Sequence, residues 1–442
     1  MKKILSILLA FLIALGAFSF VGCDEVVDIS KDATDPDETE KLTEKPTEKP
    51  TEKPTEKPSE VPTEKPTEKP TDTDISGGNI VIGMTAPLSG DALLYGRAVE
   101  HGAKSAIAEI NEAGGINGVT FSLNVKDDKN DASLVGALYD ELINEGMKIS
   151  LGSVTSGCCL SFAESAQNDG VFTLTPTATD RDLFDLDRTY GMDFAYMDEM
   201  DVLIEYLKSI YDPSDSNSLG LIYSNSDPDS KTCKEYLLSN CGGMFSSANI
   251  IDAEVAWDAY DGQAAKQLAK CKNVVVLYEI DNVTVDSLAY DVDYIKRSQG
   301  ARTENFVSVY TFYDFSWGII WDPQKINAKI LMPFDIMADN GDFADFREKY
   351  SDFHYSDAMV ALGYDAVYAI YEALLVAVEN GEKISANLSA EEFGEILDGV
   401  FASGFVFDAL TGGEDGRGSV TWYPDGRVNK GLFPVTVSSL RK

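Results

Sequence analysis

The sequence predicts an α/β protein with two lobes, each built on a parallel β-sheet that helices cover. Short apolar runs alternate with amphipathic stretches over about 360 of the 442 residues, a pattern typical of parallel sheets covered by helices. The runs are apolar throughout, as expected for strands that are buried on both faces. A single core stops growing at roughly 250–300 residues, so a stretch of this length predicts two lobes.

The expected elements follow one another from residue 79. Ile80–Met84 is the first strand, because its apolar run is short and uninterrupted. Ala98–Ala113 is the first helix, because Ile107 and Ile110 lie on one face at helical spacing, and the turn Gly114–Gly118 ends it. The same alternation predicts further strands at 121–125, 149–152, 171–174, 219–223 and 274–278, and further helices at 133–144, 163–168, 230–238, 283–298 and 358–379.

The N-terminus has the form of an export signal. Two lysines precede an apolar run at residues 4–21, and Cys23 follows closely. Ser19–Cys23 resembles the lipobox of bacterial lipoproteins, in which the cysteine is lipidated. We therefore expect residues 1–22 to be a signal peptide and Cys23 to carry the lipid. The alternative is an uncleaved helix, because the run is just long enough to span a bilayer. Both place the rest of the chain outside the cytoplasmic membrane.

Residues 23–76 are expected to form a spacer behind the lipidated cysteine. From Thr43 to Pro70 the unit Thr-Glu-Lys-Pro repeats every four residues, with one Ser-Glu-Val-Pro variant. Regular proline prevents helices and sheet ladders, and the repeat has almost nothing apolar to bury. At about 3.1 Å per residue these 28 residues extend to roughly 90 Å. A spacer of this length indicates a thick cell wall, so we expect a lipid-anchored protein on the extracellular face of the cytoplasmic membrane of a Gram-positive-type cell.

The composition excludes several functions. A net charge of −38 makes nucleic acid and anionic lipid headgroups poor partners. The chain has only two histidines, His101 and His354, which leaves little material for a catalytic triad or a histidine metal site. The aspartates at 127, 128 and 131 lack the glycine and the terminal glutamate of a calcium loop. We therefore expect no enzyme activity, no metal and no cofactor. A surface-tethered hydrolase, the rival hypothesis, would need a nucleophile with a base, and neither histidine is near Ser156 in the sequence.

Five sequence blocks occur in a set order along the folded part of the chain: 79–131, Gly152–Gly157, Thr175–Thr179, Gly363–Val367 and Gly418–Thr421. The first contains Ile-Val-Ile-Gly-Met-Thr-Ala-Pro-Leu-Ser-Gly-Asp, then Ala-Glu-Ile-Asn-Glu-Ala-Gly-Gly-Ile-Asn-Gly and Asp-Asp-Lys-Asn-Asp. Together they resemble the branched-chain amino-acid (Leu/Ile/Val) binding proteins of ABC transporters, which have the type I periplasmic-binding-protein fold. The resemblance covers most of 79–440 and is weak between residues 192 and 353.

This resemblance implies two doubly wound parallel sheets joined by three chain crossings within residues 77–442. Lobe one would hold about 79–195 and 333–402, and lobe two about 196–332 and 403–442. The chain would be a monomer that closes on a small polar solute and delivers it to a transmembrane permease with a cytoplasmic ATPase. A sensory module that docks on a membrane receptor would have the same cleft and is the alternative.

The resemblance also implies four solute-binding residues in lobe one: Tyr95, Ser156, Thr177 and Thr179. The hydroxyl of Ser156 and the nearby amides at a helix N-terminus suit a carboxylate. The carbonyl of Thr177 and the hydroxyl and amide of Thr179 would bind an α-ammonium and an α-carboxylate, and Tyr95 would contact the side chain of the solute. The alternatives are helix N-capping for Ser156 and Thr179, and an exposed loop aromatic for Tyr95.

Lobe two departs from the family pattern. Asp229 stands near a position where the family commonly has a tyrosine, and Tyr310 stands near the position of its carboxylate. An exposed loop acid is the preferred interpretation for each of four acids, any one of which could instead replace that carboxylate: Asp229, Glu279, Asp281 or Asp314. An amino acid is the expected solute, with an amide, a small peptide or another carboxylate left open.

Five cysteines follow the lipobox: Cys158, Cys159, Cys233, Cys241 and Cys271. An exported chain permits disulfides, but an odd number leaves at least one thiol without an internal partner. A helix that begins beside Ser156 would favour a thiolate at the first two. Burial as small packing residues is the preferred interpretation.

Overall fold

The computed structural model describes one compact unit within residues 71–442. The residues it describes are 77–194, 196–223, 225, 228–241, 243–252, 263–277, 291–301, 305–308, 328–332, 334, 341–350, 357–413 and 417–436. Cys23, the expected signal peptide and the expected spacer lie outside them.

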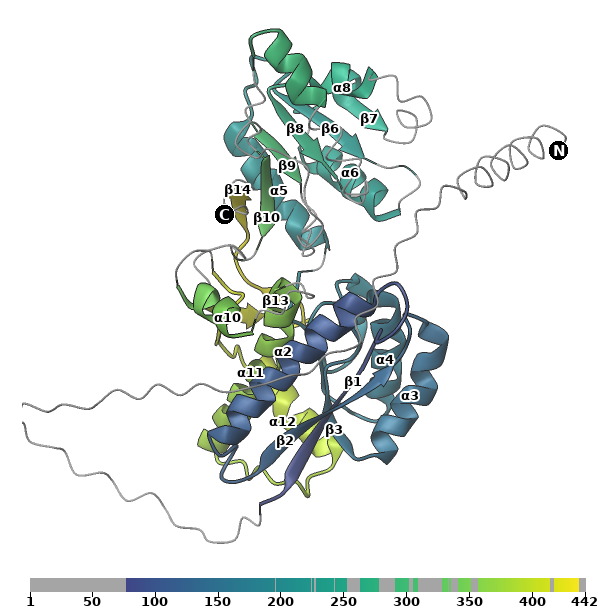
Figure 1. Ribbon diagram of the computed structural model, residues 1–442, viewed down its shortest axis with the longest axis vertical. Coiled ribbons are helices and arrows are strands. Elements are labelled where there is room, and N and C mark those ends of the chain that lie inside the picture. The colour runs from purple at the N-terminus through teal and green to yellow at the C-terminus, as the bar shows by residue number, and fades with distance from the viewer. Residues whose placement is uncertain are drawn as a thin grey trace, which may run out of the picture. The chain divides into compact units, whose positions relative to one another are not determined.

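The first sheet has five strands in the order β2-β1-β3-β4-β5, and every pairing is parallel. Its strands are β1 (Asn79–Ala86), β2 (Thr120–Asp127), β3 (Met147–Ser150), β4 (Thr173–Thr175) and β5 (Thr189–Gly191). Helices α2 (Leu93–Glu112), α11 (Asp357–Glu379) and α12 (Ala390–Ala402) cover one face, where Ile80, Ile82 and Met84 are buried. Helices α3 (Ala132–Asn144) and α4 (Ser156–Asn168) cover the other (Figure 1).

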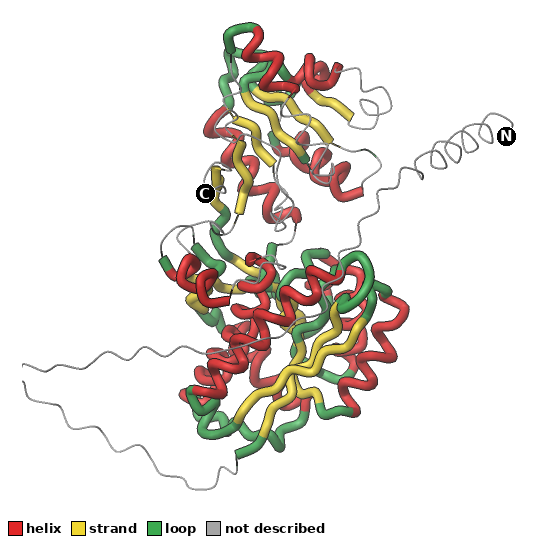
Figure 2. Tube along the Cα trace, in the orientation of Figure 1, coloured by secondary structure: helices red, strands yellow, loops and turns green. Residues whose placement is uncertain are grey.

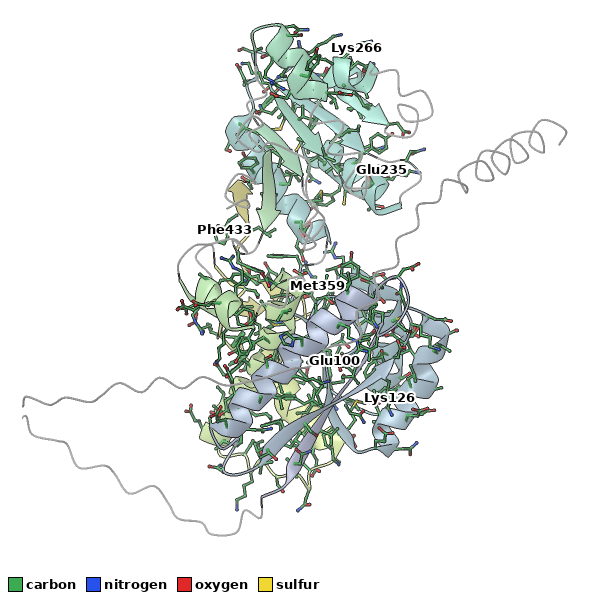
Figure 3. All side chains as sticks on the ribbon, viewed as in Figure 1. Glu100, Lys126, Glu235, Lys266, Met359 and Phe433 are labelled. Atoms are coloured by element: carbon green, nitrogen blue, oxygen red, sulfur yellow. The ribbon has the colours of Figure 1, made fainter. Side chains whose placement is uncertain are left out.

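Helices α2 and α11 pack closely because glycines face each other's backbone. A Cβ placed on Gly102 of α2 would lie 1.8 Å from the carbonyl oxygen of Val360, and one on Gly363 would lie 2.4 Å from that of Val99. Glu100 and Met359, both labelled in Figure 3, lie on these two helices. Among the described helices, only α11 is apolar and long enough to cross a membrane by length and composition, and 61% of its most apolar window is buried in the domain.

Helix α10 (Asp342–Tyr350) is attached to α2 and α11 through the carboxylate of Glu109. Tyr364 and Tyr368 donate hydrogen bonds to Oε2 at 2.5 and 2.8 Å, and Tyr350 and Lys349 of α10 donate to Oε1. Burial alone would raise the pKa of Glu109, but these four donors together lower it to about 2. The carboxylate is therefore ionised and joins three helices of the first lobe.

The second sheet has six strands in the order β14-β10-β9-β8-β6-β7. They are β6 (Leu219–Tyr223), β7 (Ile250–Asp252), β8 (Asn273–Val276), β9 (Asn305–Ser308), β10 (Ala328–Met332) and β14 (Phe433–Thr436). The pairings are parallel except that of β10 with β14. The edge strand β14 is antiparallel because it follows a β-hairpin rather than a crossover helix.

Helices lie on both faces of the second sheet (Figure 2). Leu219, Leu221 and Val275 pack with α5 (Tyr196–Ile210) and α6 (Pro228–Asn240). Val274 and Val276 belong to a different buried cluster that includes α8 (Gln263–Leu268). Residues 291–298 are also helical, and short 3₁₀ turns occur at η1 (Arg181–Asp185) and η2 (Ser247–Asn249). Because successive residues of β8 contribute to separate clusters, the sheet is doubly wound, as predicted.

A small antiparallel sheet of β11 (Phe407–Ala409), β12 (Gly418–Trp422) and β13 (Val428–Asn429) packs on the first lobe. The indole of Trp422 donates a hydrogen bond to the carbonyl of Gly191 at 2.6 Å, and the buried Asp365 of α11 accepts from the backbone after β11. The sequence had predicted that residues 403–442 belong to lobe two. These contacts differ from that prediction, since Trp422 of β12 and the residues just after β11 contact elements of the first lobe and, of the described strands after residue 403, only β14 joins the second sheet.

The chain passes between the two sheets three times, which the resemblance had implied. It leaves the first sheet after β5, returns between β10 and α10, and leaves again between β13 and β14. The return is visible at α10, where the ring of Phe346 lies 5.0 Å from that of Tyr364 in α11.

Candidate functional site

Polar residues of the first lobe gather where β1, β2, β3 and β4 end. The carboxyl ends of parallel strands meet at one edge of a sheet, and ligands of open α/β sheets bind there. The loops after these four strands hold Ser89, Asp128, Ser153 and Thr177. Hydrogen bonds join Asp128 to Ser153 directly, Ser89 to Asp127 at the end of β2, and Thr177 to the carbonyl of Val154.

The loop after β3 leads into α4, which begins at Ser156. Its N-cap residue is Thr155, whose side chain makes no capping hydrogen bond. The first bond of the helical ladder joins the amide of Cys159 to the carbonyl of Thr155 at 2.8 Å, so the three preceding amides lie at the open end of the helix. These amides and the helix dipole favour an anion, such as a carboxylate.

The hydroxyl of Ser156 contacts the loop after β4. It accepts a hydrogen bond from the amide of Thr179 at 3.1 Å. Since Thr155 occupies the N-cap position, the N-capping interpretation of Ser156 is wrong. Thr179 lies before η1, whose N-cap is Asp180, so Thr179 is not an N-cap either.

Two threonine hydroxyls hold the loop after β3 from the side of β4. Thr177 donates to the carbonyl of Val154 at 2.8 Å, and the buried Thr175 donates to the carbonyl of Ser153 at 3.2 Å. The structure thus brings Ser156, Thr177 and Thr179 together. The hydroxyl of Thr177 is used within the protein, which is consistent with the carbonyl, not the hydroxyl, as its expected contact to a solute.

Tyr95 lies in the first turn of α2 rather than in a loop. Its side chain is half-buried and packs against the core of the first lobe. The alternative of an exposed loop aromatic is therefore wrong.

The expected residues of lobe two are described only in part. Asp229 lies in the first turn of α6, after the carboxyl end of β6. Tyr310, Glu279, Asp281 and Asp314 lie outside the described residues.

The five cysteines after the lipobox are all buried, and the structure contains no disulfide among them. Burial raises the pKa of the Cys158 thiol, and it raises that of Cys159 to about 11 although Ser153 and Thr175 oppose the shift. Burial thus disfavours a thiolate at both cysteines and supports their preferred interpretation as small packing residues. Within the part of the chain that the structure describes, no group of three or more His, Cys, Asp and Glu residues is placed to hold a metal ion.

A pocket of about 390 Å³ lies elsewhere in the first lobe, at the start of β5. Its lining includes Arg188, Asp398 and Asp425, and it contains none of the predicted solute-binding residues. The predicted residues therefore do not belong to this cavity.

The comparisons with known proteins agree with this architecture. Residues 79–237 match a family model described as periplasmic binding protein, and residues 39–76 match one described as PT disordered repeat. A Leu/Ile/Val-binding protein, BraC3, of Rhizobium johnstonii is 36% identical over 105 residues, which are 24% of this chain and 29% of that protein. The chain thus matches under a third of that relative's length.

Solved structures show the fold over a larger part of the chain. The branched-chain amino-acid transporter substrate-binding protein LivJ of Streptococcus pneumoniae, in complex with isoleucine, has a TM-score of 0.58 at 20% identity and covers 81% of this chain and 96% of its own. A solute-binding protein of an ABC transporter of R. palustris, in complex with 4-hydroxybenzoate, has a TM-score of 0.59 at 13% identity and covers 81% and 92%.

The matched family and BraC3 are named as binding proteins, and the two solved structures are named as binding proteins of transporters; none of the four is named as an enzyme. Residues 79–237 therefore belong to a periplasmic-binding-protein domain similar to the Leu/Ile/Val-binding proteins, and the chain has the type I periplasmic-binding-protein fold.

Proposed function

We propose that the chain is the extracellular solute-binding lipoprotein of an ABC importer and that it binds a small carboxylate-bearing solute, an amino acid in the first place. The observation that carries the solute class is the open N-terminus of α4 beside Ser156, Thr177 and Thr179. Amides at a helix N-terminus stabilise a bound carboxylate through hydrogen bonds and the helix dipole, without a positively charged side chain. The solute would bind without chemistry, and contacts with both lobes would stabilise a closed form.

The importer role has support from the named relatives. By their names, the Leu/Ile/Val-binding protein of Rhizobium johnstonii and the LivJ protein, solved in complex with isoleucine, bind amino acids. The structure bound to 4-hydroxybenzoate has a similar TM-score and a carboxylate solute that is not an amino acid. A carboxylate is common to these two solutes. We therefore propose that every solute of this chain carries a carboxylate, which lobe one binds, and that lobe two selects the rest of the solute.

Thermal-shift screening of residues 71–442 tests this proposal. The screen uses amino acids, their amides, short peptides and carbohydrates. A solute at 100 times its Kd stabilises the folded form by about 2.7 kcal/mol, so specific binding raises the midpoint with concentration. We expect free carboxylates to act and their amides not to act. A shift produced only by carbohydrates or cell-wall fragments would contradict the proposal.

Substitution of Ser156→Ala together with Thr179→Ala locates the site. Each hydrogen bond to a charged group contributes about 1.5–3 kcal/mol, so affinity should fall by at least tenfold while the domain stays folded. The matched control is Ser165→Ala on the same helix, whose hydroxyl donates only to the carbonyl of Ser161. Unchanged affinity in the double variant would place the site elsewhere.

The anchor and the partners are part of the same proposal. Cys23 would be lipidated and residues 1–22 removed, leaving a monomer tethered outside the membrane beside a permease and its ATPase. The unaltered chain and Cys233→Ser, the control, should incorporate a labelled fatty acid in cells, whereas Cys23→Ser should not. An unaltered chain without the label that still carries residues 1–22 would instead favour an uncleaved helix.

A further inference from the structure

Two adjacent aspartates at the end of β2 contact two different loops of the site. Figure 3 labels Lys126, the penultimate residue of β2, and Asp127 and Asp128 follow it. Asp127 accepts hydrogen bonds from the amide of Leu88 at 2.8 Å and from the hydroxyl of Ser89 at 2.7 Å, both in the loop between β1 and α2. This is the loop that leads to the first turn of α2.

Asp128 contacts the loop on the other side. It is fully buried, and its Oδ2 accepts a hydrogen bond from the buried hydroxyl of Ser153 at 2.7 Å. Ser153 precedes Thr155 and Ser156, with which α4 begins. A charge-assisted bond of this length in a buried place fixes the loop strongly.

The backbone directly after the Asp127–Asp128 pair adopts an unusual conformation, which the pair stabilises. Lys129 and Asn130 have φ values of 56° and 59°, the left-handed region that side chains rarely adopt. The amide of Lys129 donates to Asp127 Oδ1 at 3.1 Å, and that of Asn130 donates to Asp128 Oδ1 at 2.9 Å. Two successive residues in this region cost energy, which the two aspartates offset.

The pair has no simpler explanation in the helix that follows. The N-cap of α3 is Asp131, which accepts from the amide and the hydroxyl of Ser133. Neither aspartate therefore caps α3. Each carboxylate oxygen of the pair already accepts a hydrogen bond from the protein.

We propose that Asp127 and Asp128 are positioning residues of the solute site, which hold the β1–α2 loop and the β3–α4 loop at the spacing that the solute requires. Asp128 acts through Ser153 on the part of the site that binds the carboxylate. Asp127 acts through Leu88 and Ser89 on the segment that carries Tyr95. This inference rests on the proposed function.

Calorimetric titration of the full chain with L-leucine, L-glutamine and L-phenylalanine tests the proposal. Asp128→Ala should weaken the binding of each solute that the unaltered chain binds by at least tenfold and to the same extent, because all share the carboxylate. Asp128→Asn, which can still pair with Ser153 and Asn130, should recover most of the affinity. Asp127→Ala should change the ratio of affinities among the solutes, because it acts on the segment that contacts their side chains.

Asp131→Ala is the matched control, because it removes a carboxylate from the same turn. Loss of a helix cap costs about 1 kcal/mol of stability, so its thermal midpoint should fall while its affinities stay unchanged. Ser153→Ala removes the same bond as Asp128→Ala, and adding it to Asp128→Ala should cause no further loss of affinity. If Asp128→Ala does not fold, Ser153→Ala alone tests whether the bond between these two residues affects affinity.

Two results overturn the inference and differ from failure of the proposed function. If the unaltered chain binds a solute and Asp128→Ala or Ser153→Ala binds it equally well, the pair does not position the site. If Asp131→Ala loses as much affinity as Asp128→Ala, the effect is general destabilisation. If the unaltered chain binds none of the three solutes, the proposed amino-acid function fails, and the inference fails with it.

Discussion

Gly102→Ala is the substitution whose effect the packing of the first lobe predicts most sharply. The added Cβ would lie 1.8 Å from the carbonyl oxygen of Val360 and 2.9 Å from the amide nitrogen of Tyr364, both in the backbone of α11. An ordinary contact between these atoms needs at least about 3.4 Å. The two helices must therefore move apart by more than an ångström along their contact.

The cost follows from that displacement. Overpacking of a core by one methyl group usually costs about 1–3 kcal/mol, and here the neighbour is backbone rather than a flexible side chain. Against this stands the gain of roughly 1 kcal/mol from replacing glycine by alanine inside a helix. Because backbone cannot yield as a side chain can, we expect the upper end of this difference, a net loss of about 2 kcal/mol, which corresponds to a decrease of roughly 3 °C in the unfolding midpoint of a domain of this size.

Gly136→Ala in α3 is the matched control, because a Cβ there meets no atom within 4 Å. It should raise stability by up to about 1 kcal/mol. Urea and thermal unfolding of residues 71–442, followed by circular dichroism, measure both variants. Equal stability of the two alanine variants, or a gain in Gly102→Ala, would refute the close packing of α2 on α11.

Three further predictions follow from the described contacts. Glu109→Gln should lower the urea midpoint at pH 7 because four donors lose an ionised acceptor. The folded-state pKa of Glu109, about 2, lies below the usual 4.5, so this loss of stability should be full above about pH 4.5 and shrink as the pH falls toward 2. Glu112→Gln, at an exposed position, should show no such trend. Trp422→Phe should lower the free energy of unfolding by about 1–2 kcal/mol, because the carbonyl of Gly191 loses its buried donor. Tyr423→Phe, at the exposed neighbouring position, should lower it by less than about 0.5 kcal/mol, as is usual for surface sites. Iodoacetamide at pH 8 should modify none of the five buried cysteines in the folded protein and all five in urea, as measured by mass spectrometry; rapid modification of any one in the folded protein would contradict its burial.

Strands and core helices were predictable where the pattern of apolar residues is local. The expected strand at 219–223 coincides with β6, and the expected helix at 358–379 differs from α11 by one residue. Helix α2 begins at Leu93, five residues before its expected start, because its first turn has no clear apolar stripe. Helix α4 begins at Ser156 rather than 163, because its first turn is Ser-Gly-Cys-Cys, which gives no helical signal in the sequence.

Features that depend on long-range contacts were not predictable. The strands β11, β12 and β13 have five residues or fewer, and their place on the first lobe is set by the packing of Trp422 and by Asp365. The orientation of β14 depends on its partner β10, which is about 100 residues away in the sequence. Neither the placement of the three short strands nor the orientation of β14 can be predicted from the spacing of residues in the sequence.

The candidate site divides in the same way. The family resemblance implied that Ser156, Thr177 and Thr179 belong to one site, and hydrogen bonds bring their loops together. The contacts that hold them were missed, because Asp128 and Ser153 are 25 residues apart and neither resembles a capping or metal pattern. The two adjacent aspartates were visible in the sequence, but their hydrogen bonds to two different loops depend on residues 25 to 39 positions away along the chain.

The central claim is that the N-terminus of α4 binds the carboxylate of the solute. The most direct test is calorimetric titration of residues 71–442 with L-leucine, L-glutamine and L-phenylalanine, each compared with the amine that remains when its carboxylate is removed. Two or more charge-assisted hydrogen bonds contribute at least about 3 kcal/mol, so the account predicts that the amine of each bound amino acid binds at least a hundredfold more weakly. An amine that binds as tightly as its amino acid would contradict it.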